Sequence, residues 1–238
     1  MRTSRAIWAV ASIGVVETLV VGVAALPASL CWTWLFTFPV PTWIVPRAVL
    51  AAMSFVPAYL VFCIALATLS AASTRALGWR TRPNQSWKLA DLEWPLLDWM
   101  RYMVSTHVVR VLVGTFFRAS PIWTLYLRMN GARMGRGVYV NTLSISDHNL
   151  LEFGDRVVVG ESVHLSGHTV EGGVVKTAAV RLGPGATVGL GSIIGIGVEV
   201  GEGSQIGALS VVPKYTKIEP HATYAGVPAR RIERAAAL

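Results

Sequence analysis

The sequence predicts a mainly β protein, a solenoid of parallel strands that follows a pair of membrane-spanning helices. Two observations lead to this prediction: a six-residue repeat fills the second half of the chain, and two long apolar stretches fill the first. The composition agrees, because 53% of the 238 residues are hydrophobic and only 14% are charged. That balance is unusual for a soluble enzyme.

The repeat runs without a break from Leu182 to Tyr224. An aliphatic residue opens each unit, and a glycine or another small residue usually follows it. The opening residues are Leu182, Val188, Ile194, Val200, Ile206, Val212, Ile218 and Tyr224. Six residues hold a short strand and a tight turn, and three such units close a triangular coil with the aliphatic side chains inside.

The same phase continues upstream with gaps, from Met134 to Leu165. One extra residue falls near Glu152, and an eleven-residue excursion, 171–181, interrupts the repeat before Leu182. We therefore expect a β-solenoid domain over residues 133–231, with about five coils, and a short tail over residues 232–238.

This domain resembles the hexapeptide-repeat acyltransferases, whose fold is a left-handed parallel β-helix. The segment Gly226-Val227-Pro228-Ala229 is similar to the Gly-x-Pro-Ala closing motif of that superfamily. The resemblance implies a left-handed winding, an acyl donor carried on pantetheine, and homotrimers with active sites between subunits.

Two apolar stretches, residues 7–30 and 48–69, are each long enough to cross a bilayer as a helix, which takes about 20 residues. Aromatic residues and prolines in 31–45 indicate an interfacial turn between them. A signal peptide is the alternative for the first stretch, but Glu17 at its centre and the second stretch argue against it. We expect a transmembrane hairpin over residues 1–74, in which Glu17 makes a polar contact between helices rather than a functional site.

Basic residues flank both ends of this hairpin, whereas the turn carries only Arg47. They are Arg2 and Arg5 before the hairpin, and Arg75, Arg80, Arg82 and Lys88 after it. The positive-inside rule then predicts a multi-pass protein of the cell membrane with both termini and the β-helix in the cytoplasm.

Residues 75–132 predict a basic helical neck at the membrane surface, with a helix from Pro95 to Phe117. Between Trp99 and Val138 there are six cations and no acid: Arg101, Arg110, Arg118, Arg128, Arg133 and Arg136. Such a stretch either contacts anionic membrane lipids or attracts a polyanionic donor such as coenzyme A or an acidic carrier protein. No motif for DNA or RNA accompanies the net charge of +8, so nucleic acid is not an expected partner.

The neck and the first coils are similar to one particular branch. The segment 125–138, with Ser146-Asp147-His148 and Gly167-His168-Thr169, resembles the C-terminal membrane module of certain nonribosomal peptide synthetases, including poly-lysine synthetases. In that branch such modules recur in tandem after adenylation and carrier domains. A single module implies a homotrimer, and a separate synthetase or carrier protein as a partner, since this chain has no segment expected to activate an amino acid.

His168 is the candidate general base. Acyl transfer from a thioester needs a base with a pKa near 7 to deprotonate the incoming hydroxyl or amine. The resemblance implies that this base is a histidine on an outward face beside a protruding loop, and His168 directly precedes the excursion. His148 is expected on the same side one coil earlier, as a second acid–base or positioning group, with Asp147 able to orient an imidazole. The alternative for His168 is an exposed turn residue without a role.

Three histidines also invite comparison with the γ-class carbonic anhydrases, which share this fold and bind zinc. His148, His164 and His168 are packed into barely more than one coil, and the distant third ligand is missing. We therefore expect no metal.

A donor groove is expected along the later coils, with acyl-coenzyme A or a phosphopantetheine-linked acyl group as co-substrate and no tightly bound cofactor. Small residues would let the pantetheine arm lie against the backbone, and cations would bind phosphates. The candidates are Gly195, Gly207, Ala208, Ser210, Lys214 and Arg230. Each is also explained as an ordinary turn or surface residue.

Together these features predict a membrane-anchored acyltransferase that acts on a hydroxyl or an amine. Two other interpretations stay open: an amide-bond-forming partner of a synthetase that makes a peptide or poly-amino acid, and a non-catalytic membrane scaffold. The sequence names neither donor nor acceptor.

Overall fold

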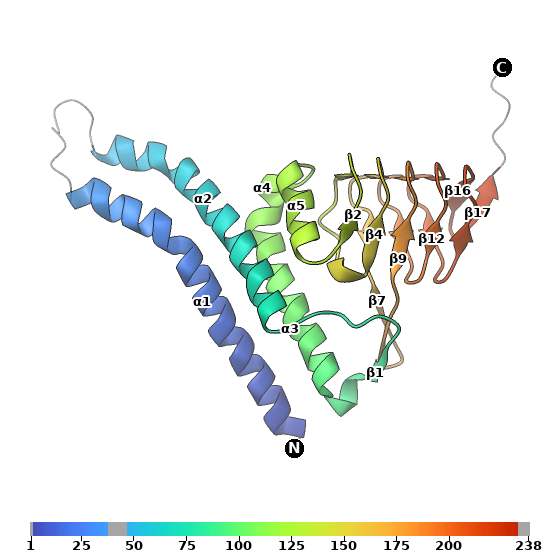
Figure 1. Cartoon of the computed structure of the whole chain (residues 1–238), viewed down its shortest axis with the longest axis horizontal. Helices are drawn as coiled ribbons and strands as arrows, with labels where there is room; N and C mark the ends of the chain where they lie inside the picture. The colour runs from blue at the N-terminus through green and yellow to red at the C-terminus, as the bar shows by residue number, and fades with distance from the viewer. Residues whose placement is uncertain (1, 38–46, 233–238) are drawn as a thin grey trace.

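The structure, a computed structural model, describes residues 2–37 and 47–232. Its first part is a hairpin of two long helices, α1 (Arg2–Thr37) and α2 (Arg47–Ala76), at the end of the molecule opposite the strands (Figure 1). Both are long and apolar enough to span a membrane. They extend beyond the predicted stretches, and α1 includes the first seven residues of the predicted turn, because Trp32 still packs on α2 through a 2.9 Å hydrogen bond to Ser54. Residues 38–45 of that turn and residues 233–238 of the predicted tail, 232–238, lie outside the described residues, whereas Ile232 belongs to the last strand.

The neck that follows is helical, as predicted, but it begins with a strand that was not predicted. Its elements are β1 (Ser86–Lys88), the 3₁₀ turn η1 (Leu89–Asp91), α3 (Trp94–Val109), the π-helical η2 (Arg110–Gly114), α4 (Thr115–Phe117) and α5 (Pro121–Met129). The helix predicted from Pro95 to Phe117 is confirmed, with Pro95 in the first turn of α3. At α5 the Ser120 side chain accepts a hydrogen bond from the Trp123 N–H and caps the helix.

Helix α1 packs along α3, and two polar pairs mark the contact. Arg101 is only 4% exposed; its Nε donates to Ser12 of α1 at 3.0 Å, and its Nη1 lies 2.9 Å from Asp98. Of the six cations in the basic stretch, Arg101 therefore faces neither lipid nor a soluble donor, because α1 covers that face of α3. Further along, the Ser105 hydroxyl donates to Glu17, so this carboxyl does make a polar contact between helices.

Beyond the neck the chain visits three sheets in rotation; their strands are parallel except for the last strand of the chain, which pairs antiparallel with the strand before it. The first contains β2 (Arg133–Met134), β4 (Leu151–Phe153), β9 (Val180–Leu182), β12 (Glu199–Val200) and β15 (Lys217–Ile218). The second contains β3 (Tyr139–Val140), β5 (Val158–Val159), β10 (Thr187–Val188), β13 (Gln205–Ile206), β16 (Thr223–Gly226) and β17 (Ala229–Ile232). The third contains β6 (His164–Leu165), β11 (Ile193–Ile194) and β14 (Val211–Val212). These strands stack away from the neck toward the C-terminus (Figure 1).

The register of these sheets confirms the repeat. Val188 pairs with Ile206 and Val200 pairs with Ile218, so partners are three six-residue units apart. The opening aliphatic residues form the core, and every one from Leu182 to Ile218 is buried. The upstream pairs carry the predicted irregularities: Met134 pairs with Phe153 and Phe153 with Leu182, which accommodates first the extra residue and then the excursion.

The excursion is a β-hairpin that fastens the strand domain to the neck. It consists of β7 (His168–Glu171) and β8 (Val174–Thr177), so it begins three residues earlier than predicted. Gly172 and Gly173 form its two-residue turn with φ values of 54° and 74°, which suit glycine. Strand β8 pairs antiparallel with β1, and Trp87, Leu96, Trp99 and Val175 bury a small core between hairpin and neck. His168 therefore lies where hairpin, strand domain and neck meet.

Candidate active site

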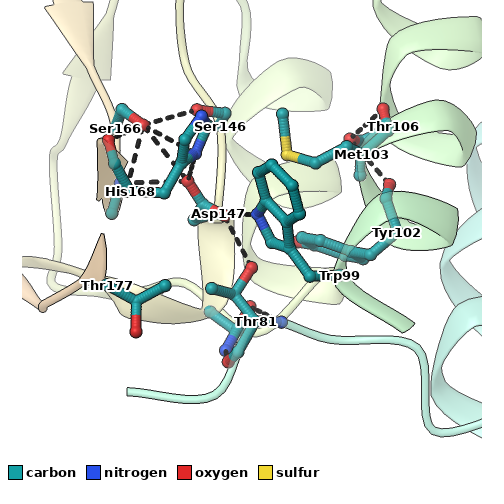
Figure 2. A network of polar contacts seen from close by, with 12 residues as sticks. Thr81, Trp99, Tyr102, Met103, Thr106, Ser146, Asp147, Ser166, His168 and Thr177 are labelled. Atoms are coloured by element: carbon teal, nitrogen blue, oxygen red, sulfur yellow. Dashed lines mark hydrogen bonds and ion pairs between the residues drawn. The ribbon is translucent and has the colours of Figure 1, made fainter. Parts of the chain in front are cut away.

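The centre of the candidate site is the carboxylate of Asp147, which has no exposed surface. Its Oδ1 accepts hydrogen bonds from Thr81 Oγ1 at 2.6 Å and Trp99 Nε1 at 3.1 Å. Its Oδ2 accepts from the backbone N–H of Gly167 at 3.1 Å. It also accepts from Ser166 Oγ at 3.2 Å (Figure 2). Burial alone would raise the pKa of Asp147, but hydrogen bonds and charge attraction, chiefly from His168, outweigh burial and hold that pKa below its ordinary value. The buried carboxyl is therefore ionised at neutral pH.

His168 is bound to this carboxylate, with Nδ1 2.5 Å from Asp147 Oδ2. Its ring meets the Trp99 ring edge-on, with the ring centroids 5.0 Å apart, and its side chain remains 20% exposed. A carboxylate that accepts from Nδ1 keeps the proton of the neutral imidazole on that nitrogen. The other nitrogen, Nε2, then has a free lone pair that can accept a proton. This is the arrangement that a general base needs.

Local backbone geometry brings the two residues together. Asp147 has a φ of 51° and caps a 3₁₀ turn, η3 (His148–Leu150). Gly167 lies against it, and a Cβ at Gly167 would come within 2.9 Å of the Asp147 Cβ and 2.8 Å of the Leu150 Cβ. Only glycine lets the chain approach the carboxyl closely enough for the Gly167 N–H to donate to it.

His148 does not share the open side with His168, and the expectation that it does is wrong. The left-handed backbone at Asp147 turns His148 inward, where it is 1% exposed. Its ring meets the rings of Tyr102 and Tyr126 edge-on, at centroid distances of 6.2 and 5.7 Å. Burial lowers the pKa of His148 to about 4, so this imidazole is neutral near pH 7. We assign it a packing role.

His164 projects from β6 and is exposed beside the site. Partial burial lowers its pKa, and the nearby His168 and Arg110 lower it further. The part of the chain that the structure describes contains no group of three metal-ligand side chains.

The residues expected to hold the donor differ in how the structure places them. A Cβ at Gly195 would lie 2.6 Å from the Lys214 backbone N, so the next coil already requires glycine there, and a Cβ at Gly207 would meet Ala225. Ser210 is fully buried, so its predicted contact with pantetheine is wrong: Oγ accepts from the Gly226 N–H at 3.1 Å and faces the corner of the coil.

The other three candidates lie on the outside of the strand domain. Ala208 is exposed, and Arg230 is exposed on β17. Lys214 bonds Glu171 at the tip of the hairpin, which lowers the pKa of that carboxyl. The Lys214 ammonium is thus paired with a carboxylate of the hairpin that begins at His168.

Sequence reasoning missed three residues that hold the Asp147 carboxylate: Thr81, Trp99 and Ser166. Trp99 lies in the predicted neck helix, but nothing in its spacing relates it to a carboxyl 48 residues later. Thr81 lies in the segment between α2 and β1, without any motif. Ser166 stands two residues before His168 in the repeat phase, which is the one signal that was available.

Comparisons with known proteins give two kinds of relative. No family model matches the chain. Over 139 residues it is 26% identical to the delta-poly-L-ornithine synthetase of Acinetobacter baumannii; the match covers 57% of this chain but only 10% of that protein, so the chain spans about a tenth of the relative's length.

The solved structures that it resembles include several acetyltransferases. One from Vibrio cholerae, complexed with acetyl coenzyme A, is 21% identical, with a TM-score of 0.40 over 43% of this chain and 60% of that chain. A maltose O-acetyltransferase of Clostridium difficile 630 is 17% identical (TM-score 0.47, 63% and 92% covered), and a galactoside acetyltransferase in complex with coenzyme A is 20% identical (TM-score 0.41, 55% and 78% covered). The sequence itself resembles the same two classes of protein.

Proposed function

We propose that this chain is a membrane-anchored acyltransferase that moves an acyl group from a pantetheine thioester to a hydroxyl or an amine, with His168 as the general base. The observation that carries the proposal is the hydrogen bond between His168 Nδ1 and the buried Asp147 carboxylate. Burying an ionised carboxylate costs desolvation free energy, even when five donors bond to it. Here it has one partially exposed partner, and that partner is a residue able to take up a proton.

The chemistry needs no protein nucleophile. His168 Nε2 takes the proton of the acceptor hydroxyl or amine while the acceptor atom attacks the thioester carbonyl carbon. The carbon–sulfur bond then breaks, and the proton on Nε2 passes to the leaving thiolate. Asp147 stabilises the imidazolium that exists between these two transfers, as carboxylates do in related dyads.

The wider arrangement completes the proposal. Helices α1 and α2 anchor the enzyme in the membrane with both termini and the strand domain in the cytoplasm, and the strands wind as a left-handed β-helix. Three copies assemble, and the donor lies along the later coils near Lys214 and Arg230. The basic flanks of the hairpin support this orientation, and the six-residue repeat supports the winding.

The test compares cells that carry the wild-type protein, His168→Ala or His221→Ala at equal membrane abundance. His221 is an exposed turn histidine at the far end of the strand domain, so its replacement is the matched control. Profiles of acylated and amide-linked small molecules and lipids should lose one product in His168→Ala alone, since removal of a general base lowers rates by about 10²- to 10⁴-fold. Identical profiles in all three would exclude His168 as the base and favour the scaffold interpretation.

A second candidate function is amide-bond formation with an aminoacyl group delivered by a carrier protein. The match to a poly-ornithine synthetase favours it. Purified protein supplied in parallel with acyl-coenzyme A and with a carrier-bound aminoacyl thioester separates the two donors. Turnover of the carrier-bound donor alone would support the second function, and turnover of acyl-coenzyme A alone would support the first.

A further inference from the structure

A recess of about 490 Å³ lies where the last turn of α2 meets the neck. Its walls include Arg75 at the end of α2, Trp79 and Arg80 from the segment after it, and Tyr102, Asn130 and Asn149 on the neck and strand-domain side. Sites for small molecules typically enclose about 300–1,000 Å³. The recess is therefore large enough to hold a polar head group.

The recess is positively charged. Arg75 and Arg80 line it, and no acidic residue does. Among the described residues neither arginine has a carboxylate within ion-pair distance, unlike Arg133, Arg181 and Arg231 of the strand domain. Two guanidinium groups that face one cavity without a counter-ion favour an anion, and above all the oxygens of a phosphate.

The position of Arg75 matches the depth of lipid head groups. Between Arg47 and Arg75 the helix carries no charged side chain. These 28 residues rise by about 42 Å, and a bilayer including its head groups is about 40–45 Å thick. If Arg47 lies at one surface of the membrane, Arg75 lies among the head groups of the other, and the exposed Leu77 lies at the same end of α2.

We propose that this recess binds the phosphate group of an anionic phospholipid, with Arg75 and Arg80 contacting the phosphate oxygens and the acyl chains lying along the apolar surface of α2. A soluble phosphate compound offers the same oxygens but no acyl chains. The lipid is favoured because the recess opens at the end of a helix whose exposed surface is apolar over its length.

The recess also shares a wall with the candidate active site. Arg80 precedes Thr81, whose hydroxyl donates to Asp147. Asn149, from the floor of the recess, accepts from the Thr81 N–H at 3.4 Å and donates to the Thr81 carbonyl at 2.7 Å. A bound head group would therefore hold the same segment that anchors the Asp147 carboxylate, although lipid binding itself does not depend on acyl transfer.

The experiment titrates detergent-purified, delipidated full-length protein with phosphatidylglycerol and with phosphatidylcholine and counts bound lipids by native mass spectrometry. Wild-type protein should prefer phosphatidylglycerol, and the double variant R75Q/R80Q should bind it about thirtyfold more weakly, since each cation near a membrane surface contributes roughly a fivefold factor. The control R156Q/K217Q removes the same charge from two exposed basic residues of the strand domain and should change binding less than about twofold.

Three results decide the matter. Equal binding of the two lipids by the wild type, or unchanged binding in R75Q/R80Q that still elutes as a folded protein, would overturn the proposal. Displacement of phosphatidylglycerol by inorganic phosphate at comparable concentration would show that the recess binds soluble phosphate and not the phosphate of a lipid. Because His168→Ala should bind lipid as the wild type does, a failure of the proposed catalysis leaves this measurement unaffected.

Discussion

The regular coils from Leu182 to Tyr224 and the interrupted coils before them share one six-residue repeat but bury different kinds of polar side chain. In the regular coils the fully buried polar side chains are corner serines; Ser192 donates to the Gly207 carbonyl and Ser204 to the Glu219 carbonyl. In the interrupted coils the buried polar set includes Asp147, a charge with five donors. In the unbroken repeat the buried polar groups thus bond within the coils, whereas the interrupted coils bury a carboxylate together with the donors that hold it, which is what the proposed mechanism requires.

The acids of the two regions show the same contrast. Glu199 of the regular coils lies between Arg181 at 2.8 Å and Lys217 at 3.8 Å, in an exposed row of alternating charges along the first sheet. Exposed pairs of this kind contribute about 0–1 kcal/mol to stability. Asp147 is buried and bonded to His168, so in the proposed mechanism its charge acts on the reaction rather than at the surface.

The largest expected difference between the regions is therefore in rate. Asp147→Asn should lower turnover by about 10²- to 10⁴-fold, because an amide neither stabilises the imidazolium nor holds the proton on Nδ1. Glu199→Gln removes one acid from the regular coils and should leave turnover unchanged. Release of the coenzyme A thiol, or of the carrier thiol, measures both variants. Near-normal turnover in Asp147→Asn would remove the carboxylate from the mechanism.

A smaller difference is expected in the response to acid. His148 binds a proton near pH 6.5 in the unfolded chain but only near pH 4 in the folded protein, so the unfolded state gains protons first as the pH falls. Its contribution to stability is complete above pH 6.5 and is lost progressively toward pH 4, by about 3 kcal/mol. The pKa of Asp147 lies below its ordinary value, so this carboxyl does not titrate in that window.

Thermal unfolding midpoints between pH 7 and pH 4.5 measure this effect. The midpoint of the wild type should fall more steeply than that of His148→Gln, whereas His221→Gln, in an exposed turn of the regular coils, should follow the wild type. Parallel curves for wild type and His148→Gln would show that His148 is not buried and neutral in solution.

The same contrast explains how much the sequence predicts. The regular coils follow from six residues of spacing, because each unit contacts only its neighbours in the stack. The helices of the neck and hairpin follow from local apolar composition. For the interrupted coils, the sequence predicted the positions of the interruptions and the candidate residues His168 and Asp147. The inward orientation of His148 was not predicted. It depends on the left-handed backbone conformation of Asp147, which the six-residue spacing does not specify.

The contacts that cross between regions were not predictable either. Strand β1 is a three-residue segment whose partner, β8, lies 86 or more residues later, with Lys88 opposite Val174. Thr81 and Trp99 reach Asp147 across 66 and 48 residues. Such contacts depend on tertiary packing and leave no periodic signal. By contrast, the Gly172-Gly173 turn is a local hairpin signal that should have placed the excursion as two strands.

The smallest expected difference concerns two glycines that both allow a close approach. A Cβ at Gly167 would press on Asp147 and Leu150, and a Cβ at Gly183 would press on the backbone of the next coil, 2.8 Å from the Glu202 N. Gly167→Ala and Gly183→Ala should each destabilise the fold by about 1–3 kcal/mol. Only Gly167→Ala should also lower turnover per folded molecule, because it displaces the carboxylate from His168. Turnover of both variants is measured at a temperature well below their thermal unfolding midpoints. An equal loss of turnover in the two variants would mean that the position of Asp147 tolerates movement. The pair of Asp147 and His168 would then not be a finely placed catalytic pair.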